Sequence, residues 1–204
     1  MIKQNYYKTS DVMVLSDLDG SFLTPITYSF DGALKGLDFL RDRNIEPIFA
    51  SSKTASEISS IQRKIKSRGL LVCENGGAIV DTRLNENSVL KVFGRPRGTW
   101  MPQVIKLRKE LKLKFWGFSD WSVSMLREQT GLSELSARAA QARNFSEPVV
   151  WEDSDTKLDY FKEELERINL VAIEGGQFLS IQVNMIKGSL PAGCGLTLEI
   201  LKVG

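Results

Sequence analysis

VLSDLDGSFL, residues 14–23, ends an apolar run with Asp17 and Asp19 and continues with Gly20 and the hydroxyl residue Ser21. A short continuous apolar run predicts a strand covered on both faces, so the two aspartates would stand at the end of a buried strand. Two carboxylates this close repel each other unless a cation lies between them, and their oxygens suit Mg2+. The first could attack a phosphorus atom and the second could serve as general acid and base, whereas a solvated loop or a helix cap is the plainer alternative.

Strand and helix patterns alternate after this stretch. Apolar residues at helical spacing predict a helix in 30–44, and an apolar run predicts a strand in 45–51 that starts late because of Pro47. Thr54 and Glu57 then form the capping-box pattern that opens a second helix, and this helix is expected to end at a glycine.

A third apolar run, residues 70–73, leads into ENGGAIV, residues 74–80. Strands that alternate with helices through short connections predict an α/β fold with a parallel sheet and helices packed on it. Asp17, Ser51 and Glu74 follow the three predicted strands. Because ligands of such sheets bind at the carboxyl ends of the strands, we expect three loops to converge on one crevice.

Composition limits the functions that this chain can have. Its 204 residues are 42% hydrophobic with a net charge of +2, so nothing in the charge balance favours nucleic acid or an anionic membrane as a partner. Histidine is absent, which excludes Ser-His-Asp and Cys-His catalysis and histidine metal sites. The two cysteines, Cys73 and Cys194, lack metal-ligand spacing and indicate a reducing compartment. Neither a signal peptide nor a membrane span is recognisable, so we expect a cytoplasmic protein.

The middle of the chain changes to an α+β pattern. Strands are expected at 88–96, 147–151 and 170–183, and helices at 101–114, 132–143 and 154–169. We therefore predict the first part of a core at 1–84, an inserted α+β cap at 85–175 and the second part of the core at 176–204.

Several separated segments carry a resemblance to a known family. They are SDLDGSFLTPITYSF, FASSKTASEI, ENGGAIV, GLS, RNFSEPVVW and GGQFLSIQV. In order and spacing the chain resembles the mannosyl-3-phosphoglycerate phosphatase branch of the haloacid dehalogenase (HAD) type phosphatases, from about residue 12 to about residue 188. The resemblance implies a HAD-like Rossmannoid fold, with a three-layer parallel-sheet core and an inserted α+β cap of the C2 type.

The resemblance also implies roles for individual residues. Asp17 matches the nucleophile and Asp19 the general acid and base, and both match Mg2+ ligands, Asp19 also through its backbone carbonyl. Ser51 and Lys187 match residues that bind the transferring phosphoryl group. The residues that match positions near the substrate are Ser52, Lys53, Glu74, Asn75, Gly76, Arg143, Ser146 and Glu147. Plain structural roles remain open for several of them: a surface lysine at 53 or 187, a turn at the glycines, and a charged helix end at Arg143.

The chain departs from the family pattern after Gly188. Where the family has an acidic loop with further Mg2+ ligands, this chain has SLPAGCGLTLEILKVG, residues 189–204, with Glu199 as its only acid. A carboxylate from elsewhere, such as Asp153, Asp155 or one of a partner chain, would have to complete the site. Three hypotheses follow: a Mg2+-dependent phosphomonoesterase for a small phosphorylated sugar-acid such as mannosyl-3-phosphoglycerate, an inactive ligand-binding remnant of such an enzyme, or a sugar phosphatase of other specificity.

Overall fold

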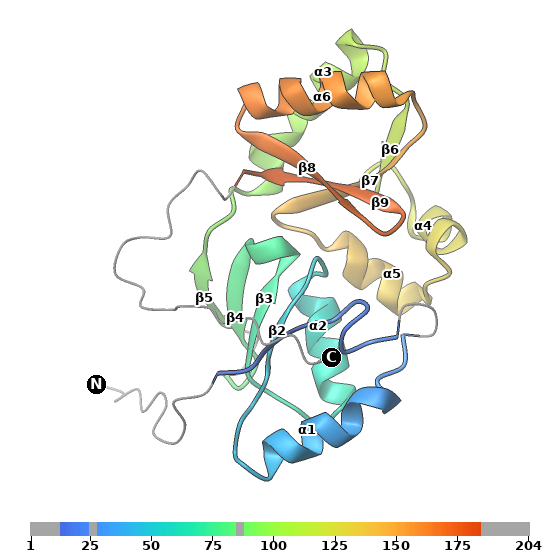
Figure 1. The fold of residues 1–204 in the computed structure, drawn as a ribbon. Coiled ribbons are helices and arrows are strands. Elements are labelled where there is room, and N and C mark those ends of the chain that lie inside the picture. Colours follow the sequence, from blue (N-terminus) through green and yellow to red (C-terminus); the bar gives the residue numbers. More distant parts are fainter. Residues whose placement is uncertain (1–12, 25–27, 85–87, 185–204) are drawn as a thin grey trace.

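The computed structural model of the chain describes residues 13–24, 28–84 and 88–184, and within these it forms two sheets (Figure 1). The first sheet has the strand order β1-β2-β3-β4-β5. Its strands are β1 (Leu15–Asp17), β2 (Ile48–Ala50), β3 (Leu70–Cys73), β4 (Ala78–Asp81) and β5 (Ser88–Val92). β1, β2 and β3 are parallel, and β4 and β5 extend the sheet in antiparallel fashion. The predicted α/β class is confirmed, with a mixed sheet in place of a wholly parallel one.

Two helices connect the parallel strands, α1 (Leu34–Arg41) and α2 (Ala55–Lys64), as the spacing of apolar residues predicted. The capping box of α2 is present, because Thr54 accepts a hydrogen bond from the Glu57 amide while the Glu57 side chain accepts one from the Thr54 amide. β2 begins directly after Pro47, which lacks the amide proton that a strand pairing needs.

The second sheet is antiparallel with the order β6-β7-β9-β8. Its strands are β6 (Phe115–Gly117), β7 (Ser146–Trp151), β8 (Leu170–Gly175) and β9 (Phe178–Val183). The helices of this part are α3 (Met101–Glu110), α4 (Val123–Thr130), α5 (Glu134–Gln141) and α6 (Asp155–Arg167). Neither β6 nor α4 was predicted.

Both predicted cap boundaries differ from the structure. β5 was assigned to the cap but pairs with β4 in the first sheet. β9 was assigned to the second part of the core, but it lies between β7 and β8 in the second sheet. The boundary at 175/176 cuts a hairpin whose turn uses Gly176 at φ +60°, a conformation that glycine adopts without strain. The second part therefore includes residues 178–183.

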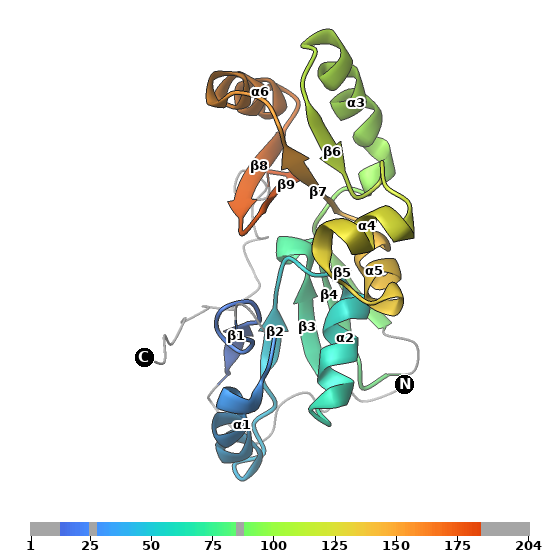
Figure 2. The ribbon, with the colours of Figure 1, turned by 90° about the vertical axis from the view of Figure 1, so that its right-hand side faces the viewer.

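Each part has its own hydrophobic core. In the first part, Phe49, Ile58 and Leu71 are fully buried where α2 covers the sheet. In the second part, α3 and α6 cover one face of the sheet around Phe161 and Ile181. Figure 1 shows α3 and α6 on the side of the second sheet that is turned away from the first, and the turned view of Figure 2 agrees.

The other side of the second part meets the first sheet. Both views place α5 beside α2, and the Thr54 hydroxyl donates a hydrogen bond to the Ala139 carbonyl across this contact (Figure 2). The arrangement places the second part over the carboxyl ends of β1, β2 and β3. No helix of the described ranges is long and apolar enough to cross a membrane.

Candidate active site

The end of β1 brings Asp17 and Asp19 to the surface. Leu18 between them is fully buried, so the alternation of side chains along an extended chain turns both carboxylates away from the core. A tight turn follows, in which the Leu23 amide donates to the Leu18 carbonyl at 2.7 Å and Gly20 has φ +75°. The predicted D-x-D geometry at a strand end is thus present.

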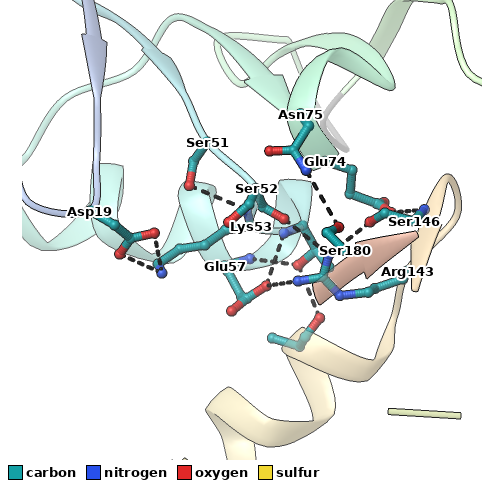
Figure 3. Close-up of polar contacts among 12 residues, drawn as sticks. Asp19, Ser51, Ser52, Lys53, Glu57, Glu74, Asn75, Arg143, Ser146 and Ser180 are labelled. Carbon is teal, nitrogen blue, oxygen red and sulfur yellow. Dashed lines mark hydrogen bonds and ion pairs between the residues drawn. The ribbon is translucent and has the colours of Figure 1, made fainter. Parts of the chain in front are cut away.

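Lys53 holds the carboxylate of Asp19. Its ammonium nitrogen lies 2.7 and 2.8 Å from the two Asp19 oxygens, and it also lies 5.3 Å from the centre of the Tyr28 ring (Figure 3). The pair is only partly covered, with 19% of the Lys53 side chain and 39% of the Asp19 side chain exposed. Lys53, predicted to lie near the substrate, is therefore next to one of the two predicted catalytic carboxylates.

The surroundings of Asp17 disfavour the ionised form of its carboxyl group. Removal of water by the surrounding protein raises the pKa of Asp17 above its usual value, and this outweighs the hydrogen bond from the Leu18 amide, which lowers it. The negative charge of Asp19 raises this pKa further. A bound cation would relieve both effects.

The loop after β2 brings Ser51 and Lys53 to the same place. Ser51 is buried, its amide donates to the Val72 carbonyl at 3.0 Å, and its hydroxyl accepts the Lys53 amide at 3.2 Å. The Asn75 amide donates to the Ser51 carbonyl at 3.0 Å, which ties this loop to the end of β3. Ser52 turns its side chain outward and offers its carbonyl to Arg143. The structure thus brings Asp19, Ser51 and Lys53 together, as the sequence predicted.

Glu74 has a different environment from the one expected of a substrate contact. It is 2% exposed, and its carboxylate accepts hydrogen bonds from the amides of Asn144, Phe145 and Ser146 and from the Ser146 hydroxyl, at 2.8 to 2.9 Å. A carboxylate has about four acceptor sites. Oε1 accepts one of the four hydrogen bonds and Oε2 accepts three, so both oxygens are bound inside the protein, and the geometry does not favour the predicted substrate contact of Glu74.

Asn75 and Gly76 continue from Glu74 in left-handed backbone conformations, with φ +54° and +95°. The side-chain Nδ2 atom of Asn75 donates to the Gln182 side-chain oxygen at 2.8 Å and lies 3.5 Å from the Ser180 hydroxyl. Ser180 and Gln182 project from the same face of β9, and sequence reasoning missed both. The alternation of these polar residues with Leu179, Ile181 and Val183 was the signal that could have revealed them.

Arg143 lies at the contact between the two parts with 9% of its surface exposed. Its Nη1 atom donates to the Ser52 carbonyl at 2.9 Å and to the Ser146 hydroxyl at 2.8 Å, and its Nη2 atom lies 3.9 Å from Glu57 (Figure 3). Burial lowers the pKa of Arg143, while the charges of Glu57 and Glu74 act in the opposite direction. The contacts of this guanidinium group are therefore within the protein.

Glu147 is fully buried on the opposite face of β7 from Ser146. Its carboxylate pairs with Arg97 and accepts the Ser119 amide at 2.7 Å. Gly117 leaves room for it, because a Cβ at that position would lie 2.4 Å from a Glu147 oxygen. The predicted substrate contact of Glu147 is not favoured, because this side chain faces the helical side of the second sheet.

The residues that could hold a metal ion are Asp17 and Asp19. The described part of the chain has no cluster of three or more metal-ligating side chains. Asp153 pairs with Lys157 at the start of α6, on the face of the second sheet turned away from β1, and Asp155 begins that helix. Neither is placed to complete the site. Lys187, the remaining predicted catalytic residue, and residues 189–204 lie outside the described residues.

Cys73, at the end of β3, is buried, and burial together with the charge of Glu74 raises the pKa of its thiol to about 11. This thiol stays protonated at neutral pH, so it is not a nucleophile of the site.

The fold is that of known hydrolases. A haloacid dehalogenase-like hydrolase from Bacteroides thetaiotaomicron is similar with a TM-score of 0.60 at 14% sequence identity, covering 84% of this chain and 70% of that one. A haloacid dehalogenase-like hydrolase from B. subtilis has a TM-score of 0.58 at 14% identity, with 84% and 73% covered. A sugar phosphatase of HAD subclass IIB has a TM-score of 0.55 at 9% identity, with 84% and 69% covered.

At these identities the solved structures show the fold alone, and the sequence shows the family. The family model described as haloacid dehalogenase-like hydrolase matches residues 14–174, which is most of the chain. The match begins at the stretch that carries Asp17 and Asp19 and runs through both sheets as far as β8. The chain belongs to the haloacid dehalogenase-like hydrolases.

Proposed function

We propose that this chain hydrolyses phosphate monoesters at the carboxyl ends of β1 and β2. The observation that supports this most strongly is the placement of Asp17, Asp19, Ser51 and Lys53 at the carboxyl ends of β1 and β2, with Lys53 bound to the partly exposed Asp19. Two carboxylates can transfer a phosphoryl group and a proton, while a hydroxyl and an ammonium group stabilise the charge on phosphoryl oxygens.

The reaction has two steps, in which Asp17 carries the phosphoryl group and Asp19 donates and then accepts a proton. In the first, an oxygen of Asp17 attacks phosphorus in line with the ester oxygen, the bond to that oxygen breaks, and Asp19 gives the oxygen its proton. In the second, water attacks the aspartyl phosphate, Asp19 takes the proton of the water, and inorganic phosphate leaves with Asp17 restored.

Lys53 has to change partner during this cycle. In the structure its ammonium group neutralises both oxygens of Asp19, so Asp19 must leave Lys53 and take up a proton from solvent before it can act as the acid of the first step. The phosphoryl oxygens of a bound substrate carry the charge that would draw Lys53 away. Substrate binding would then free Asp19 and place the ammonium group beside the phosphoryl oxygens.

The family chemistry and the donor set fit a Mg2+ ion in part. The carboxylate of Asp17 and the groups of Asp19 are hard oxygen ligands of the kind that Mg2+ takes. The pKa of Asp17 is raised mainly by removal of water and further by the charge of Asp19, and a cation would oppose both effects. When bound, the ion would supply neutralisation of the carboxylate and phosphoryl charges.

For the substrate we propose a phosphorylated sugar-acid such as mannosyl-3-phosphoglycerate. The resemblance of the separated sequence segments to the phosphatases of that ester supports this proposal, and one of the similar solved structures is a sugar phosphatase. Ser180 and Gln182 on β9 offer a hydroxyl and an amide on the face of the second sheet that meets Asn75. Such groups suit sugar hydroxyls.

One observation favours a second function: the Lys53 ammonium group donates hydrogen bonds to both carboxylate oxygens of Asp19. A site in which this pair persists could bind a phosphorylated ligand without hydrolysing it. The chain would then be a ligand-binding relative of the phosphatases.

The two functions are separated by measuring phosphate release from mannosyl-3-phosphoglycerate and from a panel of sugar phosphates, with Mg2+ and with EDTA. The first function predicts metal-dependent turnover that Asp17→Asn, a variant of nearly equal volume, abolishes. A folded wild-type chain that binds the esters without releasing phosphate would contradict the first function and support the second.

A further inference from the structure

Residues 143–146, which we call the junction segment, join α5 to β7 and lie where the two parts of the molecule meet (Figure 3). Phe145 fills the space beside two glycines. A Cβ atom at Gly77 would lie 2.6 Å from the Phe145 Cβ, and one at Gly94 would lie 3.0 Å from it. Both glycines leave room for this ring, so the junction segment is closely packed against β4 and the end of β5.

Glu74 binds the junction segment through its whole carboxylate. All four donors are in that segment, three amides and the Ser146 hydroxyl, although they are 70 to 72 residues away in the sequence. A buried carboxylate that accepts backbone amides forms strong, charge-assisted hydrogen bonds. Glu74 thereby fixes the start of β7, and with it the second sheet, relative to the end of β3.

Arg143 continues this network to the loop of residues 51–53. Its Nη1 atom donates to the Ser52 carbonyl and to the Ser146 hydroxyl, and the same hydroxyl donates to Glu74. Two further hydrogen bonds close the ring from the other side, because the amide of Glu74 donates to the Lys53 carbonyl and that of Asn75 to the Ser51 carbonyl. The three residues of the loop are therefore held by their own carbonyl oxygens.

We propose that Glu74 and Arg143 are positioning residues, which hold the 51–53 loop so that the Ser51 hydroxyl and the Lys53 ammonium group face the Asp17–Asp19 pair. The proposal rests on the phosphatase function proposed above, because it assigns these two residues a part in that reaction without contact with the substrate. It replaces the substrate contacts that the sequence suggested for them.

The first test measures amide hydrogen exchange by mass spectrometry and needs no turnover. Glu74→Gln keeps the volume but places an amide group against amide donors, and Arg143→Lys keeps the charge but removes the guanidinium group whose Nη1 atom bonds Ser52 and Ser146 and whose Nη2 atom faces Glu57. Both variants are expected to speed exchange in peptides that cover 51–53 and 144–146 by about tenfold or more, since each breaks the side-chain network that joins these segments and leaves the loop held only by backbone hydrogen bonds.

Glu147→Gln is the matched control for this measurement. It is also a fully buried carboxylate of β7, but its partners Arg97 and Ser119 both belong to the second part. Exchange in 51–53 is expected to stay at the wild-type rate in this variant. If Glu74→Gln does not fold, Ser146→Ala, which removes the hydroxyl between Arg143 and Glu74, takes its place beside Arg143→Lys.

The second test compares two esters, mannosyl-3-phosphoglycerate and p-nitrophenyl phosphate, which has neither a sugar nor a carboxylate. Displacement of the loop should lower kcat for both esters by the same factor, of about 10 to 100, with KM nearly unchanged. A direct contact of Arg143 with the substrate carboxylate would instead raise KM for the sugar-acid alone.

Each of the two tests can contradict the proposed positioning role of Glu74 and Arg143. Unchanged exchange in 51–53 in both variants would overturn the proposal, and so would a loss confined to the sugar-acid ester. If the wild-type chain hydrolyses neither ester, the proposed function fails, while the exchange rates still show whether Glu74 and Arg143 hold the loop.

Discussion

At the scale of single residues, Lys53 is the side chain that binds Asp19, one of the two predicted catalytic carboxylates. It comes from the loop after β2, 34 residues away from Asp19, and its ammonium group is the only one with a hydrogen bond to this carboxylate among the described residues. In the proposed reaction it serves first as the counter-ion of Asp19 and then as a ligand of the phosphoryl oxygens. Its removal should therefore affect the reaction more than the fold.

Lys53→Met keeps the apolar stem and removes the charge. We expect a fall in kcat/KM of about 100-fold to 1000-fold, the usual effect of removing one group that stabilises transition-state charge, and little change in the free energy of unfolding, because the ion pair is partly exposed. Phosphate release and urea unfolding measure the two quantities. Lys64→Met, at an exposed position in the last turn of α2, is the control. A gain in activity in Lys53→Met would show that the ion pair between Lys53 and Asp19 inhibits the reaction.

At the scale of secondary-structure elements, the Thr54 side chain contributes a hydrogen bond to the contact between α2 and α5. The Thr54 hydroxyl caps α2 by accepting the Glu57 amide at 3.2 Å, and it donates to the Ala139 carbonyl at the end of α5 at 2.9 Å. Thr54 is 1% exposed, so water cannot replace either bond at low cost. One hydroxyl thus joins a helix of each part.

Thr54→Ala should lower the free energy of unfolding by about 1 to 2 kcal/mol, because α2 loses its cap and the Ala139 carbonyl loses a donor. Thr54→Ser keeps the hydroxyl and should cost much less. Urea denaturation followed by circular dichroism measures both. Equal losses in the two variants would assign the effect to the methyl group and contradict the role of the hydroxyl.

The elements also show which features a sequence reveals. The capping box of α2 was predictable because Thr54 and Glu57 are three residues apart and determine their geometry locally. The sheet to which β5 and β9 belong was not predictable, since an apolar run indicates a strand without indicating which sheet the strand joins. Glu74 illustrates the same limit within the site: its position after β3 was predicted, but its partners lie about 70 residues further along the chain. Contacts at such separation depend on topology, which residue patterns do not encode.

At the scale of the whole molecule, the two parts are expected to unfold together. The contact through Glu74 and the junction segment is buried and charge-assisted, and loss of either part would leave its groups unpaired. The positions of the tryptophans make this testable. All four of them, Trp100, Trp116, Trp121 and Trp151, belong to the second part, so their fluorescence reports on that part alone.

A substitution at Asp81, a carboxylate of the first part, can destabilise that part and so test whether the second part unfolds with it. Asp81, at the end of β4, is 1% exposed and accepts three hydrogen bonds from the amide and guanidinium group of Arg83, at 2.7 to 2.9 Å. The hydrogen bonds from the Arg83 side chain lower the pKa of Asp81 below the ordinary value of 3.8, against the effect of burial. The folded state thus binds this proton less readily than the unfolded state. The resulting stabilisation is complete above pH 3.8 and is lost as the pH falls through the folded pKa.

Asp81→Asn should therefore lower the free energy of unfolding by about 1 kcal/mol at pH 7, a modest value because Arg83 is partly exposed, and the difference from wild type should shrink below pH 3.8. Urea unfolding at several pH values, followed by circular dichroism and by tryptophan fluorescence, measures it, with Asp42→Asn at an exposed position of the same part as control. If the parts form one cooperative unit, the fluorescence midpoint moves with the dichroism midpoint although no tryptophan lies near Asp81 in the sequence. A fluorescence transition that stays in place while the dichroism signal shifts would show that the two parts unfold independently and that the junction segment does not couple them.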